Sequence, residues 1–300
     1  MMILNVGTRF INKEKIKDKD MMITKNYIAK GEGANRFEKI PVQIYETADE
    51  AVKAVAREIV DLVQTKAASS EKCVLGLATG VSPIKLYQEL VRMHREEGVS
   101  FRNVVTFNLD EYLPMPKESE QSYHYFMHHH LFDHIDIDPK NIHIPDGTLK
   151  AEEIENFCKE YERQIEAAGG IDLQILGIGR TGHIGFNEPG SFITSQTRKV
   201  FLNDLTIKDA IKDFGSRNLV PTKAITMGVG TIMQARRVIL MAWGEKKAPI
   251  IKATVEGRVS DSVPATFLQM HSNVQFIIDE SAASELTRAD YPWLVSKVNW

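Results

Sequence analysis

The sequence predicts an α/β fold with a mostly parallel β-sheet and helices on both faces. Several segments are short and almost continuously apolar, as is typical of strands buried on both faces. Amphipathic segments of helical length lie between them, with apolar residues three and four positions apart. This alternation of strands and helices along the chain is typical of a parallel sheet.

The expected strands share this apolar character and are bounded by polar or glycine-containing segments. They are residues 42–46, 73–78, 104–110, 173–179, 224–230, 237–243 and 274–279.

The clearest predicted helices are residues 48–67 and 82–98. Thr47 is expected to cap the first helix and Ser82 the second, where Pro83 also suits the first helical turn. Both helices directly precede or follow a predicted strand, as expected for βα units.

The chain is expected to fold as one α/β domain over residues 41–300. Residues 1–40 are charged and irregular and are interpreted as an N-terminal extension. No internal repeat or linker is evident after residue 40. We also expect the natural protein to continue beyond Trp300.

Composition excludes several classes of protein. The 300 residues are 43% hydrophobic and 26% charged, with a net charge of −3, which argues against nucleic acid or an anionic membrane as the main partner. The two cysteines, Cys73 and Cys158, give neither a metal-binding spacing nor a disulfide framework. With no signal peptide evident in residues 1–12, a cytoplasmic location is expected.

The first stretch with chemical potential is LATGVSPIKLY, residues 77–87. A strand runs into Thr79, Gly80 and Ser82 and then into a helix. The free N–H groups of a helix N-terminus, together with two hydroxyls, form a suitable phosphate site. A tight strand-to-helix turn without a ligand explains the same residues equally well.

The second stretch is FNLDEYLPM, residues 107–115, in which a strand ends on Asp110 and Glu111. A partly desolvated carboxylate there could act as a general base. The alternative is a solvated Asp-Glu pair that opens a loop. The histidine-rich segment at 122–134 is interpreted as a structural or surface helix without a metal, because consecutive histidines point in different directions on a helix.

The third stretch is GIGRTGHIGFNEPG, residues 177–190. Its glycine spacing alone is weak evidence for a dinucleotide site, and it follows the fourth predicted strand. A nucleotide loop would also not require His183 and Glu188. A carboxylate bonded to a histidine fixes the tautomer of the imidazole, which suits a proton shuttle. A structural histidine in a glycine turn is the alternative.

Taken together, these stretches resemble the glucosamine-6-phosphate deaminase (isomerase) family over about residues 41–290. The motifs that carry the resemblance include FNLDEY and GHIGFNEP, and they occur in the family's order. The resemblance implies a modified Rossmann-like fold and the conversion of glucosamine 6-phosphate and water to fructose 6-phosphate and ammonia. It implies no metal or organic cofactor, and a homo-oligomer, commonly a hexamer.

The resemblance also implies roles for individual residues. Asp110 matches the base that moves a proton between C2 and C1. His183 matches the proton shuttle for ring opening, and Glu188 matches its supporting carboxylate. Thr79, Gly80 and Ser82 match the phosphate loop, with Lys247 as its lysine.

Three departures from the family pattern lie near these residues. Thr181 occupies a position that is usually Asp, and Val81 occupies the middle of a phosphate loop that usually reads Gly-Gly-Thr or Gly-Ser-Thr. Lys212 lies near the place of a phosphate-binding arginine. Two alternatives therefore stay open. One is a non-catalytic phosphosugar sensor, and the other is a hydrolase similar to the 6-phosphogluconolactonases, which share the fold.

Overall fold

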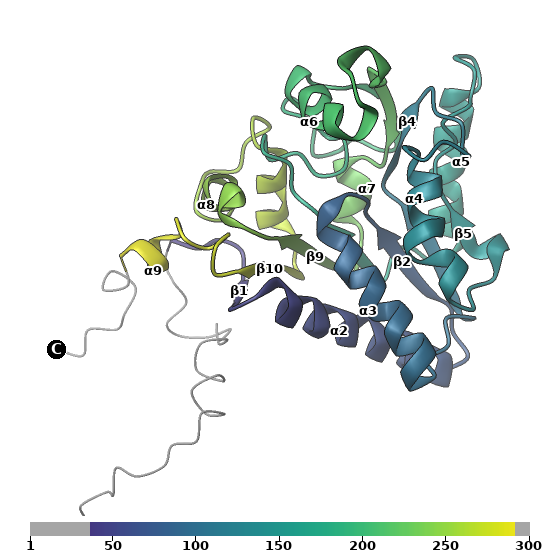
Figure 1. Ribbon diagram of the computed structural model, residues 1–300, viewed down its shortest axis with the longest axis horizontal. Helices are drawn as coiled ribbons and strands as arrows, with labels where there is room; N and C mark the ends of the chain where they lie inside the picture. The colour runs from purple at the N-terminus through teal and green to yellow at the C-terminus, as the bar shows by residue number, and fades with distance from the viewer. Residues whose placement is uncertain (1–36, 292–300) are drawn as a thin grey trace, which may run out of the picture.

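A seven-stranded sheet, parallel throughout, forms the centre of the computed structural model, which describes residues 37–291 (Figure 1). The strand order is β1-β10-β9-β6-β2-β3-β5. The strands are β1 (Val42–Tyr45), β2 (Cys73–Leu77), β3 (Val104–Asn108), β5 (Ile142–His143), β6 (Leu173–Leu176), β9 (Arg237–Ala242) and β10 (Val274–Asp279). The predicted α/β class and mostly parallel sheet are confirmed.

Two apolar layers cover the sheet, because successive residues of each strand point to opposite faces. In β9, Val238 and Leu240 join one buried cluster, and Ile239 and Met241 join the other. Helices α2 (Ala48–Ala68), α3 (Val81–Glu97) and α4 (Tyr123–His130) cover the second face. Helices α5 (Ile154–Ala167) and α8 (Ala248–Val255) cover the first, together with the short helix α7 (Val229–Met233).

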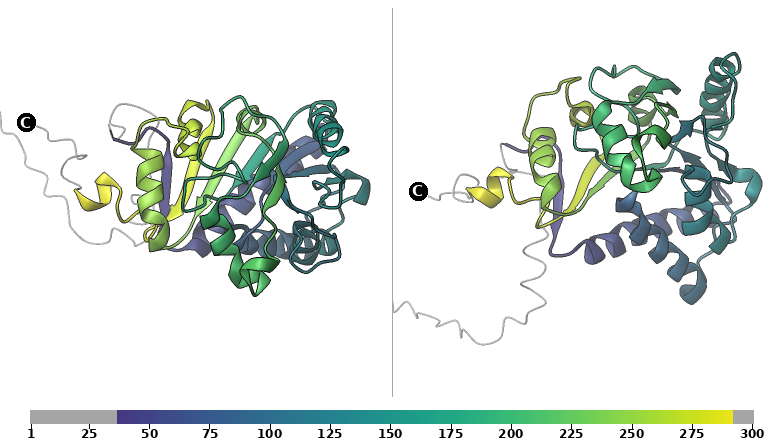
Figure 2. Two further views of the ribbon diagram at one scale, coloured as in Figure 1. Left: turned by 90° about the horizontal axis from the view of Figure 1, so that it is seen from above. Right: turned by 45° about the horizontal axis from the view of Figure 1, so that its top comes forward.

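A second, smaller sheet was not predicted. It is antiparallel, in the order β4-β8-β7, with β4 (Asp110–Leu113), β8 (Lys223–Thr226) and β7 (Arg198–Phe201). Helix α6 (Asp204–Phe214) packs on it through Ile207 and Ala210 (Figure 2).

Two strand predictions are therefore wrong in detail. The segment 104–110 divides at Leu109 between two sheets. It was predicted as one strand because its apolar residues continue across the break. The segment 224–230 stops being a strand at Thr226 and enters α7, and its strand is antiparallel.

The remaining elements are short. They are α9 (Thr287–Asp290) and the 3-10 helices η1 (Phe132–His134), η2 (Pro139–Asn141), η3 (Arg217–Leu219), η4 (Glu245–Lys247) and η5 (Pro264–Met270). Within residues 37–291, no helix has both the length and the apolar character needed to cross a bilayer.

One of the two predicted helix caps is confirmed. The Thr47 hydroxyl accepts the Glu50 N–H at 3.3 Å. The Ser82 cap is wrong, because Ser82 already lies inside α3 and the residue at the N-cap is Gly80. Gly80 has a φ of 97°, a conformation that glycine adopts without a steric penalty, so the turn ends two residues earlier than predicted.

The described residues begin at Phe37, four residues before the predicted start of the α/β domain. Residues 1–36 of the predicted extension lie outside the described residues. The Lys39 N–H donates to the Val255 carbonyl at 2.9 Å, and Ile40 is buried. Residues just before position 41 therefore already pack on the domain.

Strands β2 and β6 approach closely at Gly76, which is paired with Gln174. A Cβ at position 76 would lie 2.0 Å from Oε1 of Gln174, a fully buried side chain. We expect Gly76→Ala to lower the free energy of unfolding by about 1–3 kcal/mol through overpacking. Urea denaturation measures this change.

Gln174→Ala provides the matched background, since it removes the side chain that the new methyl group would meet. In that background, Gly76→Ala should cost much less stability. An equal cost in both backgrounds would contradict the steric explanation.

Candidate active site

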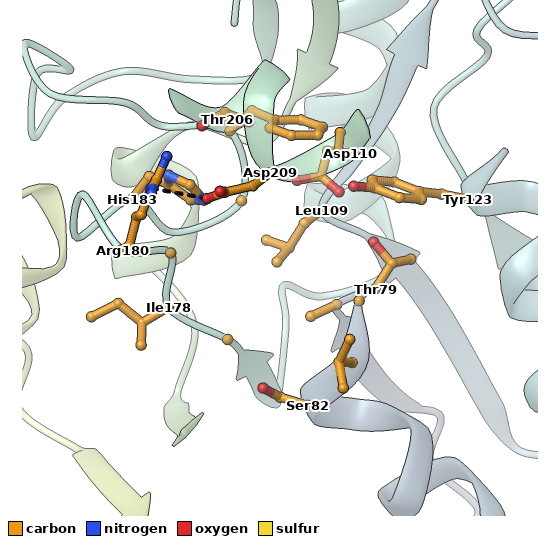
Figure 3. A pocket seen from close by; sticks show the side chains of 18 of the residues that line it. Thr79, Ser82, Leu109, Asp110, Tyr123, Ile178, Arg180, His183, Thr206 and Asp209 are labelled. Carbon is orange, nitrogen blue, oxygen red and sulfur yellow. Dashed lines mark ion pairs between the residues drawn. The ribbon is translucent and has the colours of Figure 1, made fainter. Parts of the chain in front are cut away.

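A pocket of about 420 Å³ opens at the carboxyl ends of four neighbouring strands, β9, β6, β2 and β3. Its lining includes six of the seven predicted site residues, namely Thr79, Gly80, Ser82, Asp110, His183 and Lys247 (Figure 3). The seventh, Glu188, contacts His183. The structure thus brings together three stretches that are distant in sequence, as expected at this edge of an α/β sheet.

The loop after β2 forms one wall. The first N–H groups of α3 follow Gly80, which leaves them free of intrahelical partners. The Trp243 indole N–H donates to the Ser82 carbonyl at 3.1 Å and ties the first turn of α3 to the residue after β9. Free N–H groups at a helix N-terminus suit an anionic ligand.

Lys247 supplies a positive charge to the same pocket. Its Nζ donates to the Ile178 carbonyl at 2.6 Å, which ties the lysine to the segment after β6. Burial lowers the pKa of Lys247, an effect that nearby Asp209 opposes. An anion bound next to this lysine would stabilise its charged form.

His183 and Glu188 form a pair on the opposite wall. The Nδ1 atom of His183 lies 3.2 Å from Oε2 of Glu188 and 2.8 Å from Oγ1 of Thr181. The imidazole ring lies directly over Gly179, where a Cβ would come within 2.0 Å of Nε2. A glycine at 179 is therefore required for this position of the ring.

Glu188 is held by hydroxyl groups from two segments. Thr181 donates to its Oε2 at 3.2 Å, and Thr206, from α6, donates to its Oε1. Burial alone would raise the pKa of Glu188. Its contacts with His183, Thr206 and Thr181 outweigh burial and hold the pKa below the usual value. Glu188 is thus a stable negative charge behind the histidine.

Asp110 has the opposite electrostatic environment. Its side chain is 5% exposed, and burial together with the neighbouring charge of Glu111 raises its pKa well above the usual value. Oδ2 lies 3.1 Å from the position that a Cβ on Gly185 would occupy, so the glycine leaves room for the carboxylate. A carboxylate with a raised pKa in a pocket is typical of a general base.

Sequence reasoning missed several pocket residues. Arg180 and Asp209 form an ion pair at 3.1 Å beside His183, shown by the dashed line in Figure 3. Asp209 belongs to α6, as do the pocket-lining residues Thr206 and Lys212. Helix α6 was not predicted, although its apolar spacing from Leu205 to Phe214 was a usable signal.

The histidines of the segment at 122–134 do not line the pocket, although Tyr123 near its start does. His128 contacts Asp133 at 2.7 Å in the turn that follows α4. Within residues 37–291, no group of three or more His, Cys, Asp or Glu side chains is arranged to hold a metal ion. The interpretation of this segment as a helix holds for Tyr123–His130.

Known proteins resemble this chain over most of its length. A glucosamine-6-phosphate deaminase-like protein of Bacteroides thetaiotaomicron is 47% identical over 265 residues, covering 88% of this chain. The chain spans only 40% of the length of that relative. A glucosamine-6-phosphate deaminase of Shewanella woodyi is 51% identical over 223 residues, covering 74% of this chain and 84% of the relative.

A solved structure agrees with the sequence comparison. It is described as a monomeric glucosamine-6-phosphate deaminase, is 40% identical and has a TM-score of 0.78. The match covers 82% of this chain and all of that one. Residues 46–277 match the family described as glucosamine-6-phosphate isomerases and 6-phosphogluconolactonase. On this match and on these identities, the chain belongs to the glucosamine-6-phosphate isomerase and 6-phosphogluconolactonase family.

Proposed function

We propose that this protein converts glucosamine 6-phosphate and water to fructose 6-phosphate and ammonia. One observation carries the proposal: a buried carboxylate and a histidine paired with Glu188 line the same pocket as a free helix N-terminus and a lysine. The first two suit proton transfer, and the last two suit a phosphate. Relatives named as deaminases at 47–51% identity favour this reaction over lactone hydrolysis.

His183 opens the sugar ring in this mechanism. The imidazole accepts the proton of the C1 hydroxyl and returns it to the ring oxygen, so the bond between C1 and that oxygen breaks and C1 becomes an aldehyde. Glu188 keeps its negative charge throughout and, with Thr181, orients the imidazole through Nδ1. The other ring nitrogen, Nε2, is then available for the proton transfer.

Asp110 then moves a proton between adjacent carbons. It removes the C2 proton, whose electron pair forms a C1–C2 double bond while the aldehyde oxygen takes up a proton. It returns the proton to C1, which leaves an iminium group at C2. Water adds to C2, ammonia departs and the ketone remains. The acidity of the C2 hydrogen next to a carbonyl makes a single carboxylate sufficient.

The phosphate binds, in this proposal, between the loop at Thr79–Ser82 and Lys247. It lies far from the reacting carbons, so its binding energy serves to position the sugar. The pocket volume of about 420 Å³ lies within the range of small-molecule sites.

A cytoplasmic location and a homo-oligomeric state are also proposals. Both cysteines, Cys73 and Cys158, are buried free thiols, which suits a reducing compartment. The similar solved structure is described as a monomer. Light scattering on the purified full chain tests the predicted oligomer directly.

Release of ammonia and fructose 6-phosphate from glucosamine 6-phosphate tests the proposed reaction. A sensor would bind the substrate without releasing ammonia. A lactonase would hydrolyse 6-phosphogluconolactone and leave the amino sugar unchanged. Either outcome would replace the proposal.

Asp110→Asn should reduce turnover by at least ~100-fold, the usual scale for loss of a general base. The amide cannot accept the C2 proton, so incorporation of solvent deuterium at C1 of the product should disappear too. Mass spectrometry of the product and circular dichroism of the folded variant measure both points. Near-normal turnover would reject Asp110 as the base.

Lys247→Ala should raise KM for glucosamine 6-phosphate by roughly 10-fold or more and change kcat less, because its charge binds substrate and transition state alike. Affinity for unphosphorylated glucosamine should stay almost unchanged. Lys246→Ala, an exposed neighbour, is the control. Equal losses for both sugars would show that Lys247 does not bind the phosphate.

Thr181→Val should reduce turnover roughly 10-fold, since it removes a hydroxyl that contacts both His183 and Glu188 while keeping the side-chain volume. Thr181→Ser restores the hydroxyl and should recover most of the rate. Steady-state kinetics on glucosamine 6-phosphate compare the three proteins. If the two variants are equally active, the hydroxyl has no role in orienting the histidine.

A further inference from the structure

The consecutive carboxylates of β4 point to opposite sides of the strand, as alternation requires. Asp110 lines the pocket, whereas Glu111 is only 1% exposed and points toward α4. Glu111 accepts three backbone N–H groups, from Tyr112 at 2.9 Å, Tyr123 at 3.0 Å and His124 at 2.9 Å. The last two donors are the first residues of α4. Glu111 therefore fixes the start of α4 to the strand that carries Asp110.

This anchor determines where the ring of Tyr123 lies. The ring stacks on Phe186 with centroids 6.0 Å apart and lies 5.0 Å from the ring of Tyr112. Tyr123 also lines the pocket, and Figure 3 shows its hydroxyl pointing toward the carboxylate of Asp110. The hydrogen-bond partners of this hydroxyl in the structure are Tyr112 and Thr79. Apolar contacts thus fix the ring, and its polar end faces the proposed base.

The ionised form of Asp110 requires a hydrogen-bond donor nearby. Among residues 37–291 it forms no ion pair, and both burial and the charge of Glu111 oppose its ionisation. Burial also raises the pKa of the Tyr123 phenol well above its usual value, so the phenol stays neutral and keeps its proton to donate. A neutral donor can stabilise a buried carboxylate without cancelling its charge.

We propose that Tyr123 is a positioning residue for Asp110: its phenol faces the carboxylate and donates to it once Asp110 is ionised, which orients the carboxylate for proton transfer between C2 and C1. This inference rests on the proposed function. Glu111 supports the arrangement by anchoring α4.

Several other ionisable groups surround Asp110 and enter any interpretation of a pH profile. They are Glu111 and Tyr112 on β4 and Tyr161 on α5. The same pocket is also lined by Arg180 and His183 after β6, Asp209, Lys212 and Asp213 on α6, and Lys247 on η4.

Tyr123→Phe keeps the ring contacts and removes only the hydroxyl. We expect kcat to fall roughly 10- to 100-fold, the worth of one hydrogen bond to a charged group, with KM changed less than about twofold. The acid limb of kcat/KM should move up by about one pH unit, because the ionised form of Asp110 loses its donor. Tyr125→Phe, an exposed tyrosine on the same helix, should behave as the unaltered protein.

A second substitution gives a shift of opposite sign. Incorporating 3,5-difluorotyrosine at position 123 keeps the shape of the side chain and makes the phenol a stronger donor, so the acid limb should move to lower pH. This variant tests the inference even if Tyr123→Phe folds poorly.

The outcomes separate the inference from the proposed function. If the unaltered protein releases no ammonia, the proposed function fails. If it is active and the acid limbs of the folded Tyr123 variants overlay its own, the phenol does not act on Asp110 and the inference is overturned. A fall in kcat without a shift of the acid limb would indicate a structural role only, and would also overturn it.

Discussion

The site depends on one backbone joint at Leu109, where the chain passes from the parallel sheet to the antiparallel one. The Leu109 N–H donates to the Leu77 carbonyl at 3.0 Å, and its carbonyl accepts the Met227 N–H at 2.6 Å. One residue is thus bonded to both sheets, and the next residue is Asp110.

Across the small sheet Asp110 pairs with Thr226, whose hydroxyl accepts the Phe186 N–H at 3.0 Å. The joint therefore places the carboxylate and the glycine loop at 177–190 relative to each other.

The sequence predicted the large sheet well, because strands buried on both faces are continuous apolar runs and need no tertiary information to be seen. It also placed Thr79, Asp110 and His183 at or after the ends of predicted strands, and the carboxyl ends of parallel strands share one edge of a sheet. Lys247 was expected only from the family resemblance. The relation between His183 and Glu188 was predictable for a similar local reason, since a single tight loop holds both.

What the sequence did not predict depends on contacts between distant segments. Strand β7 is four residues long, with alternating partly buried and exposed residues, and becomes a strand only by pairing with β8. The hydrogen bond from Thr206 to Glu188 joins residues that are 18 positions apart and lie in separate elements. No pattern in the sequence predicts this contact. Tyr123 lies in a segment whose most conspicuous residues are histidines. Its position is set by Glu111, which accepts the N–H groups at the start of α4. From the sequence alone, Glu111 was also explained as a solvated neighbour of Asp110.

Two carboxylates of the site, Asp110 and Glu188, have pKa values displaced in opposite directions, and this separation assigns their roles. Burial raises the pKa of Asp110 well above its usual value, so it can accept a proton and release it again. Contacts with His183, Thr206 and Thr181 overcome burial and keep Glu188 ionised, so it serves as a fixed charge beside the imidazole. The difference arises from donors: Glu188 has hydroxyls from two segments and an imidazole, whereas the donor proposed for Asp110 is a single neutral phenol. A base that must exchange a carbon-bound proton repeatedly requires this lack of strong donors, since an ion pair would stabilise the carboxylate too far to act as a base.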